Sequence, residues 1–310
     1  SGLKGVISVD RSDNELSGQI GLTNPRLFDS EYSLGGTLYA NDYSWNNYDE
    51  KSYGLNVVVG RKLTRNLSAS LGYIIEQSRI SGLSDVLKTV GYKDGKSLKS
   101  SLIPSITYNS TDDYYLPRTG IIASTSLEFA GVGGDEKFLK SRTNFNWYQG
   151  IREWVDYDLI FRFKSSFGKI WDRGWVPINE RIYLGGIRNL RGFESRTVSP
   201  KVKVASGSWY ETGGDTSFNS SAELSFPLIE RVKMRGLLFV DYGVIRGRIA
   251  NVTAPGIVDY IDGRISRYSA GAGIEWVTPM GPLQLIFAKP LKKQDGDDTS
   301  TFEFTIGQRF

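Results

Sequence analysis

The chain has 310 residues and a formal net charge of +4, and it contains neither cysteine nor histidine. Disulfides, thiolate metal sites, imidazole zinc sites, Ser-His-Asp triads and Cys-His pairs are therefore excluded. The small, dispersed charge argues against a nucleic-acid partner. Catalysis by carboxylate, lysine or tyrosine side chains remains possible in principle, but no sequence pattern places two such groups around a substrate groove. We therefore expect a protein that is not an enzyme and that holds neither a metal nor another cofactor.

Apolar and polar residues alternate with a period of two along nearly the whole chain, which is typical of β-strands. In 302–310, for example, apolar side chains fall on one face and mostly polar ones on the other. No stretch reaches the roughly 18 apolar residues of a transmembrane helix. In chain order, strands are predicted at 3–10, 14–24, 32–43, 51–63, 67–80, 98–110, 119–131, 138–150, 158–168, 218–227, 233–245, 266–277, 283–290 and 301–310.

The arrangement of these fourteen strands favours a membrane barrel over a soluble β-sandwich. Most are about ten residues long, which suits a tilted strand that crosses a membrane. Aromatic residues gather at strand ends, as membrane-interface girdles do. Short and long connections alternate, like the periplasmic turns and extracellular loops of outer-membrane barrels. We therefore predict an all-β fold, a transmembrane antiparallel β-barrel that takes up residues 1–310 as one domain.

The longest connection, 169–217, carries the sequence Leu-Gly-Gly-Ile-Arg-Asn-Leu-Arg-Gly-Phe at 184–193. This resembles the signature of the BamA/TamA superfamily, whose sixth extracellular loop carries an Arg-Gly-Phe or Arg-Gly-Tyr motif. Segments 22–25, 34–38, 239–243 and 281–293 also resemble this family. The family barrel has sixteen strands and is preceded by periplasmic POTRA domains. With fourteen strands predicted, we expect the first two strands and the POTRA domains to be absent from this chain.

The resemblance implies a role for the loop motif Arg191, Gly192 and Phe193. In the family, the loop folds back into the lumen and its arginine contacts acidic residues of the barrel wall. The matching positions here are Glu223 and Asp241. The alternation places Glu223 on the polar face of its strand, whereas Asp241 shares a face with apolar residues, so its inward placement rests on the resemblance. The alternative is that Arg191 is an exposed loop charge.

The last strand is the second candidate site. Its alternating Phe302, Phe304, Ile306 and Phe310 resemble the outer-membrane β-signal, which assembly machinery recognises by strand addition to an exposed edge. A plain lipid-facing strand end is the alternative. Gly307 matches a family glycine at which the last strand can bend inward, and packing of a small residue is the alternative there.

The resemblance implies a function in which no covalent bond is made or broken. A barrel of this family folds and inserts other outer-membrane proteins at a weak lateral seam between its first and last strands. The implied partners are unfolded outer-membrane proteins, accessory assembly lipoproteins that bind through the POTRA domains, the lipid bilayer and lipopolysaccharide. The implied location is the bacterial outer membrane, with the C-terminus facing the periplasm. A secretion or translocation pore of the same superfamily and a passive porin are the alternatives.

Overall fold

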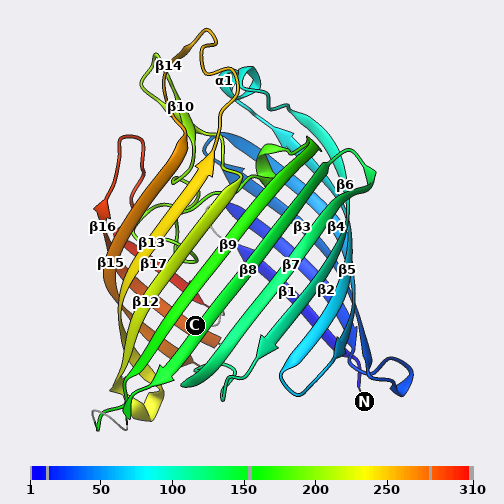
Figure 1. Ribbon diagram of the computed structural model, residues 1–310, viewed down its shortest axis with the longest axis vertical. Coiled ribbons are helices and arrows are strands. Elements are labelled where there is room, and N and C mark those ends of the chain that lie inside the picture. The colour runs from blue at the N-terminus through cyan, green and yellow to red at the C-terminus, as the bar shows by residue number, and fades with distance from the viewer. Residues whose placement is uncertain (1, 12–13, 153–155, 279–280, 307–310) are drawn as a thin grey trace.

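The computed structural model describes residues 2–11, 14–152, 156–278 and 281–306. Within them, one antiparallel sheet of fourteen strands runs in chain order (Figure 1), as predicted. Its strands are β1 (Lys4–Arg11), β2 (Glu15–Asn24), β3 (Tyr32–Trp45), β4 (Tyr48–Lys62), β5 (Leu67–Ser81), β6 (Gly95–Asn109), β7 (Thr119–Gly134), β8 (Lys137–Gly150), β9 (Ile160–Trp175), β12 (Thr216–Ile229), β13 (Met234–Gly247), β15 (Gly263–Thr278), β16 (Gly281–Lys292) and β17 (Phe302–Ile306).

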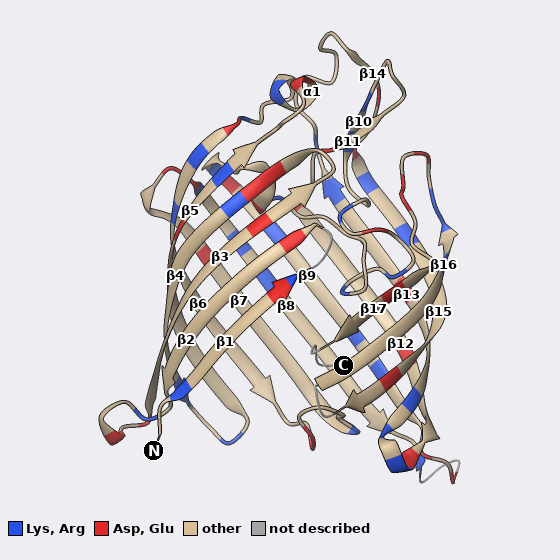
Figure 2. Cartoon of the chain, turned by 180° about the vertical axis from the view of Figure 1, so that it is seen from behind, with Lys and Arg blue, Asp and Glu red and all other residues tan. Residues whose placement is uncertain are grey.

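The sheet curls into a barrel wall whose two end strands are β1 and β17. Each strand pairs with its neighbours in the chain, so β2 is the partner of β1 and β16 is the partner of β17. Among the described residues, no strand pairing joins β1 to β17. Figure 2 shows these two strands facing the viewer at the two ends of the curled sheet. The described sheet therefore has two unpaired edges.

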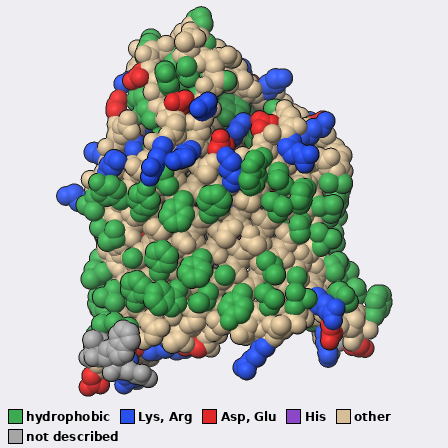
Figure 3. Space-filling view, viewed as in Figure 1, with side chains coloured by type: hydrophobic (Ala, Val, Ile, Leu, Met, Phe, Trp, Pro, Cys, Tyr) green, Lys and Arg blue, Asp and Glu red, His purple; other side chains and the backbone are tan. Residues whose placement is uncertain are grey.

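Alternation sorts the side chains of each strand between an outer and an inner face. In β13, Leu238 and Val240 are 49% and 54% exposed, whereas Leu237 and Phe239 are buried. Figure 3 shows the outer faces as a broad belt of hydrophobic side chains, with charged side chains gathered above and below it. Such a belt is typical of a barrel wall in contact with lipid. No helix in the described ranges has the length and apolar character needed to cross a membrane.

Most strands extend further toward the long connections than predicted. The predicted loop 169–217 is shortened to 176–215, because β9 continues to Trp175 and β12 begins at Thr216. In the added part of β9, Ile170 is buried on the inner face and the next residue, Trp171, is exposed, so two adjacent apolar residues break the period of two. We therefore correct the loop's bounds to 176–215.

The long connections carry small elements that the alternation did not predict. They form a three-stranded sheet at the long-loop end, in the order β11–β10–β14, which joins loop 176–215 to the connection between β13 and β15. The remaining elements are β10 (Lys201–Val204), β11 (Trp209–Glu211), β14 (Ile257–Ile261), α1 (Asp85–Thr89), η1 (Leu27–Asp29), η2 (Ile178–Glu180) and η3 (Glu230–Val232).

Candidate functional site in the barrel lumen

The loop motif is presented by a tight turn that depends on glycine. Gly185, Gly186 and Gly192 have φ values of +116°, +91° and +88°, a region that residues with a Cβ rarely adopt. A Cβ on Gly185 would lie 2.1 Å from the carbonyl oxygen of Glu194. The amide of Gly186 donates a hydrogen bond of 2.8 Å to the carbonyl of Phe193, which closes the turn. Arg191 therefore leaves the loop in a fixed direction.

Arg191 points at the inner wall of the barrel and contacts carboxylates on two adjacent strands. Its Nε and Nη2 donate to the two oxygens of Asp241 in β13, at 2.7 and 2.6 Å. Nη2 also lies 2.9 Å from Oε1 of Glu223 in β12 and donates to the hydroxyl of Ser221 at 2.6 Å. The guanidinium carbon lies 3.5 Å from the centre of the Phe239 ring. The structure thus brings together Arg191, Glu223 and Asp241, the three residues that the resemblance connects.

The wall supplies further charges around Glu223. Lys164 of β9 lies 3.0 Å from Oε2 of Glu223, and Arg162 lies 3.7 Å from the same atom. Arg162 also donates two hydrogen bonds of 2.8 Å to Glu275 of β15, in a bidentate arrangement. Three cations therefore face three carboxylates, and we call these six residues the lumen cluster: Arg162, Lys164, Arg191, Glu223, Asp241 and Glu275.

Burial makes the lumen cluster sensitive to the loss of any member. Apart from Lys164, which is partly exposed, its side chains are at most 6% exposed. Burial lowers the pKa of Arg191, but attraction to Glu223 and hydrogen bonding to Asp241 outweigh it, so that pKa is raised above its ordinary value. A guanidinium that stays charged can hold the loop against the wall at any physiological pH.

Gly192 and Phe193 complete the docking of the motif. A Cβ on Gly192 would lie 3.3 Å from the Cβ of Ala288 in β16, so the backbone passes close to the wall there. Phe193 is fully buried among aliphatic residues of its own loop and of β13 and β15. This contact set is Leu184, Leu190, Val198, Ile245 and Ile265.

The predicted residues of the last strand face away from the lumen cluster. Phe302, Phe304 and Ile306 are 48%, 63% and 53% exposed and lie on the outer face of β17. The rings of Phe302 and Phe287 lie 5.0 Å apart across β16 and β17. The other two predicted positions, Gly307 and Phe310, lie outside the described residues. The strand therefore presents an apolar outer face beside an unpaired edge.

A second buried ion cluster holds the start of the loop. Glu180 in η2 forms ion pairs with Lys99 of β6 and with Lys140 of β8, the latter at 2.8 Å. Burial raises the pKa of Glu180, but the two lysines outweigh it and hold that pKa below its ordinary value. Glu136, between β7 and β8, is also buried and accepts a hydrogen bond of 2.8 Å from Ser97. Burial, together with repulsion from Glu180, raises the pKa of Glu136 to about 7.

This raised pKa predicts an unusual pH dependence at Glu136. A carboxyl whose pKa rises from 4.5 to about 7 on folding contributes stability below pH 4.5 and loses it as the pH rises through 7. We expect Glu136→Gln to raise the unfolding temperature at pH 8 and to change it little at pH 4.5. Heat-modifiable gel migration measures this temperature. Asp85→Asn at a fully exposed carboxylate is the control; an equal shift at both pH values contradicts the assignment.

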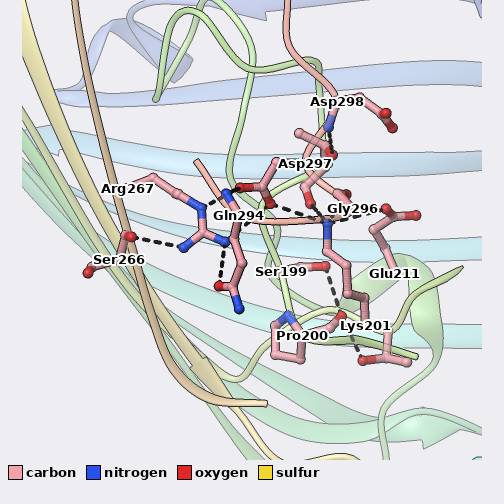
Figure 4. A network of polar contacts seen from close by, with 12 residues as sticks. Ser199, Pro200, Lys201, Glu211, Ser266, Arg267, Gln294, Gly296, Asp297 and Asp298 are labelled. Carbon is pink, nitrogen blue, oxygen red and sulfur yellow. Dashed lines mark hydrogen bonds and ion pairs between the residues drawn. The ribbon is translucent and has the colours of Figure 1, made fainter. Parts of the chain in front are cut away.

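A third contact network joins the loop to the connection between β16 and β17 (Figure 4). Lys201 of β10 donates to the carbonyl of Gly296 and lies 3.4 Å from Asp297, which is also paired with Arg267 of β15. Lys201, Asp297 and Arg267 are almost fully buried. The long loop is thus fixed at its start, at its motif and at β10.

Five functional residues were not predicted from the sequence as part of a site: Arg162, Lys164, Lys99, Lys140 and Glu180. A signal for the four cations was present, because each lies on the polar face of an alternating strand. Strand alternation does not identify the carboxylate that each cation contacts, because the two can be far apart in the chain. Arg162 and Glu275, for example, are 113 residues apart. Among the described residues, no group of three or more His, Asp or Glu side chains is placed to hold a metal ion.

Comparisons with known proteins agree with this geometry. The model of the Omp85 superfamily domain matches residues 1–310. The outer membrane protein assembly factor BamA of Neisseria meningitidis is 25% identical over all of this chain and 43% of its own length. The sorting and assembly machinery component 50 homolog of Bos taurus is 27% identical over 92% of this chain and 61% of its own length. The chain thus spans less than two thirds of these relatives.

Solved structures agree on the fold. The crystal structure of BamA from Haemophilus ducreyi lacking POTRA domains 1–3 superposes with a TM-score of 0.80 at 24% identity, covering all of this chain and 65% of that one. CdiB from Acinetobacter baumannii gives a TM-score of 0.59 at 16% identity, covering 98% of this chain and 53% of that one. The antiparallel barrel is therefore the fold of this chain.

Proposed function

The chain belongs to the Omp85 superfamily, and from this premise we propose that it is the membrane barrel of a factor that folds and inserts other outer-membrane proteins. The observation that carries the proposal is the edge of β17, which has no partner strand on its far side within residues 2–11, 14–152, 156–278 and 281–306. Backbone groups without partners cost several kcal/mol each in lipid. An incoming strand that pairs with such an edge removes this cost, which is recognition by β-augmentation.

The docked loop supports an assembly role over a passive pore. The parts of loop 176–215 that carry η2 and the motif lie inside the curled sheet, where they are held by Glu180 and by the lumen cluster. A porin needs an open aqueous path, whereas this lumen is occupied by ordered chain. The names of the relatives point the same way, since they are called assembly factors and sorting and assembly machinery components.

The proposed setting follows from this role. We place the barrel in the bacterial outer membrane, with the turns between β2 and β3 and between β4 and β5 on the periplasmic side and the C-terminus facing the periplasm. The proposed substrates are unfolded outer-membrane proteins. Accessory lipoproteins that bind through POTRA domains, and lipopolysaccharide in the outer leaflet, are further proposed partners. No enzymatic step, cofactor or nucleic acid enters this function.

Reconstitution tests the proposal. The whole protein, with any domains that accompany this barrel, is placed in liposomes, and an unfolded outer-membrane protein is added. We expect the added protein to become heat-modifiable and protease-resistant several times faster than in empty liposomes. An equal rate in both liposomes, or steady ion conductance without insertion, contradicts the proposal. Transport of one soluble protein across the bilayer would instead indicate a translocation pore.

A further inference from the structure

Three basic side chains form one row across the outer face of the barrel. Lys51 of β4 lies directly opposite Arg79 of β5, and Arg79 lies directly opposite Lys96 of β6. All three are exposed, at the long-loop ends of their strands. Figure 2 shows basic residues at this end of the wall. Like charges at directly opposed positions destabilise a sheet, so the row is unfavourable unless something else neutralises it.

The protein itself neutralises one end of this row. Lys51 forms an ion pair of 2.8 Å with Asp42 of β3. Within the described ranges, no carboxylate lies at ion-pair distance from Arg79 or Lys96. Two adjacent cations therefore lack an anion, at the border where the hydrophobic belt ends. An anionic group from the membrane surface would complete the row.

A crevice of about 570 Å³ extends from this row toward the hydrophobic belt. Its floor is made by Gly18 and Ala40, which are paired across β2 and β3 and are too small to fill the space. Leu16 lies on one side and Tyr53 on the other, and both are more than half exposed. The crevice thus has a cationic end and an apolar floor, as the binding site of an amphiphile requires.

We propose that this site binds a phosphorylated glycolipid of the outer leaflet, with its two phosphates at the two ends of the row, near Lys51 and Lys96, with Arg79 between them, and with an acyl chain over Gly18 and Ala40. Arginine can bind a phosphate through two parallel hydrogen bonds. Since neighbouring strands lie about 4.8 Å apart, the row from Lys51 to Lys96 spans about 10 Å. That span suits a disaccharide with a phosphate at each end better than a single phosphodiester. The inference rests on the proposed function in one respect only: the barrel must lie in an outer membrane, with its long loops on the outer side.

Binding of lipid A to the purified whole protein in detergent tests the inference, with native mass spectrometry to count the bound lipid. We expect Arg79→Gln/Lys96→Gln to weaken binding of bis-phosphorylated lipid A about 30-fold, from the usual attraction of two basic residues to an anionic lipid surface. The matched control is Lys62→Gln/Arg65→Gln, which removes the same charge at the opposite rim. Heat-modifiable migration shows that both variants are folded.

Each further result decides for or against the glycolipid. Loss of binding when lipid A is dephosphorylated supports it. Equal binding of phosphatidylglycerol, competition by inorganic phosphate alone, or equal weakening in both variants overturns it. Insertion of an outer-membrane protein into phospholipid liposomes is measured in parallel. A wild-type protein that binds lipid A but inserts nothing contradicts the proposed function and leaves this inference standing.

Discussion

Arg191→Ala is expected to lower the free energy of unfolding by about 3–5 kcal/mol, because it leaves buried Glu223 and Asp241 without their shared cation. The loss should include release of the loop from the wall, seen as new protease cleavage within 176–215. Urea titration in detergent micelles measures the first effect, and limited proteolysis measures the second. Arg191→Lys should recover only part of the stability, since lysine cannot bind Asp241 through two parallel bonds.

The matched control for this prediction is Arg188→Ala. Arg188 is an exposed cation of the same turn, and its removal should cost much less. Arg196 is a poor control because it is half-buried among aromatic rings, with its guanidinium 3.7 Å from the Tyr183 ring and 4.3 Å from the Trp45 ring. In the Arg191→Ala variant, neutralising the two carboxylates that lost their cation, by Glu223→Gln with Asp241→Asn, should restore part of the lost free energy of unfolding. Equal effects of Arg191→Ala and Arg188→Ala would contradict the role given to the lumen cluster.

Phe193→Ala is expected to cost about 3–5 kcal/mol, the usual loss when a fully buried phenylalanine is truncated. The cavity would lie between the loop and the inner faces of β13 and β15, where the surrounding strands cannot collapse to fill it. The same urea titration measures the effect. Phe218→Ala, at an outward phenylalanine of β12, is the control and should cost less. If the two losses are equal, burial of the motif does not hold the loop.

The strands of this barrel could be predicted from the sequence because lipid enforces the alternation. An outward residue such as Val240 must be apolar, while its neighbour Asp241 can be polar. The alternation fades where strands leave the membrane, so the ends of β9 and β12 and the small sheet β11–β10–β14 were not predicted. The strand order could be predicted because short connections join neighbouring strands. Whether β1 pairs with β17 could not be predicted, because no local sequence pattern indicates such a contact.

The candidate site was predictable only where a motif marks it. Arg191, Glu223 and Asp241 were predicted from the resemblance of the loop motif and its surroundings, and the alternation independently placed Glu223 on the polar face of its strand. No sequence motif identifies Arg162 or its partner. Its bond to Glu275 depends on the curvature of the sheet, which brings β9 and β15 toward each other inside the barrel. The pairing of Glu180 with Lys140 likewise depends on how the loop enters the lumen.

The central claim is that incoming strands pair with the open edge of this sheet. The chain has no cysteine, so one cysteine placed in β17, at Glu303, Phe304 or Thr305, reports a single position. The measurement is disulfide formation between that cysteine and one in the last strand of an outer-membrane protein halted during insertion into liposomes. The account predicts disulfides from β17 and none from Asn146, which lines the lumen. Disulfides from Asn146 and none from β17 would contradict it.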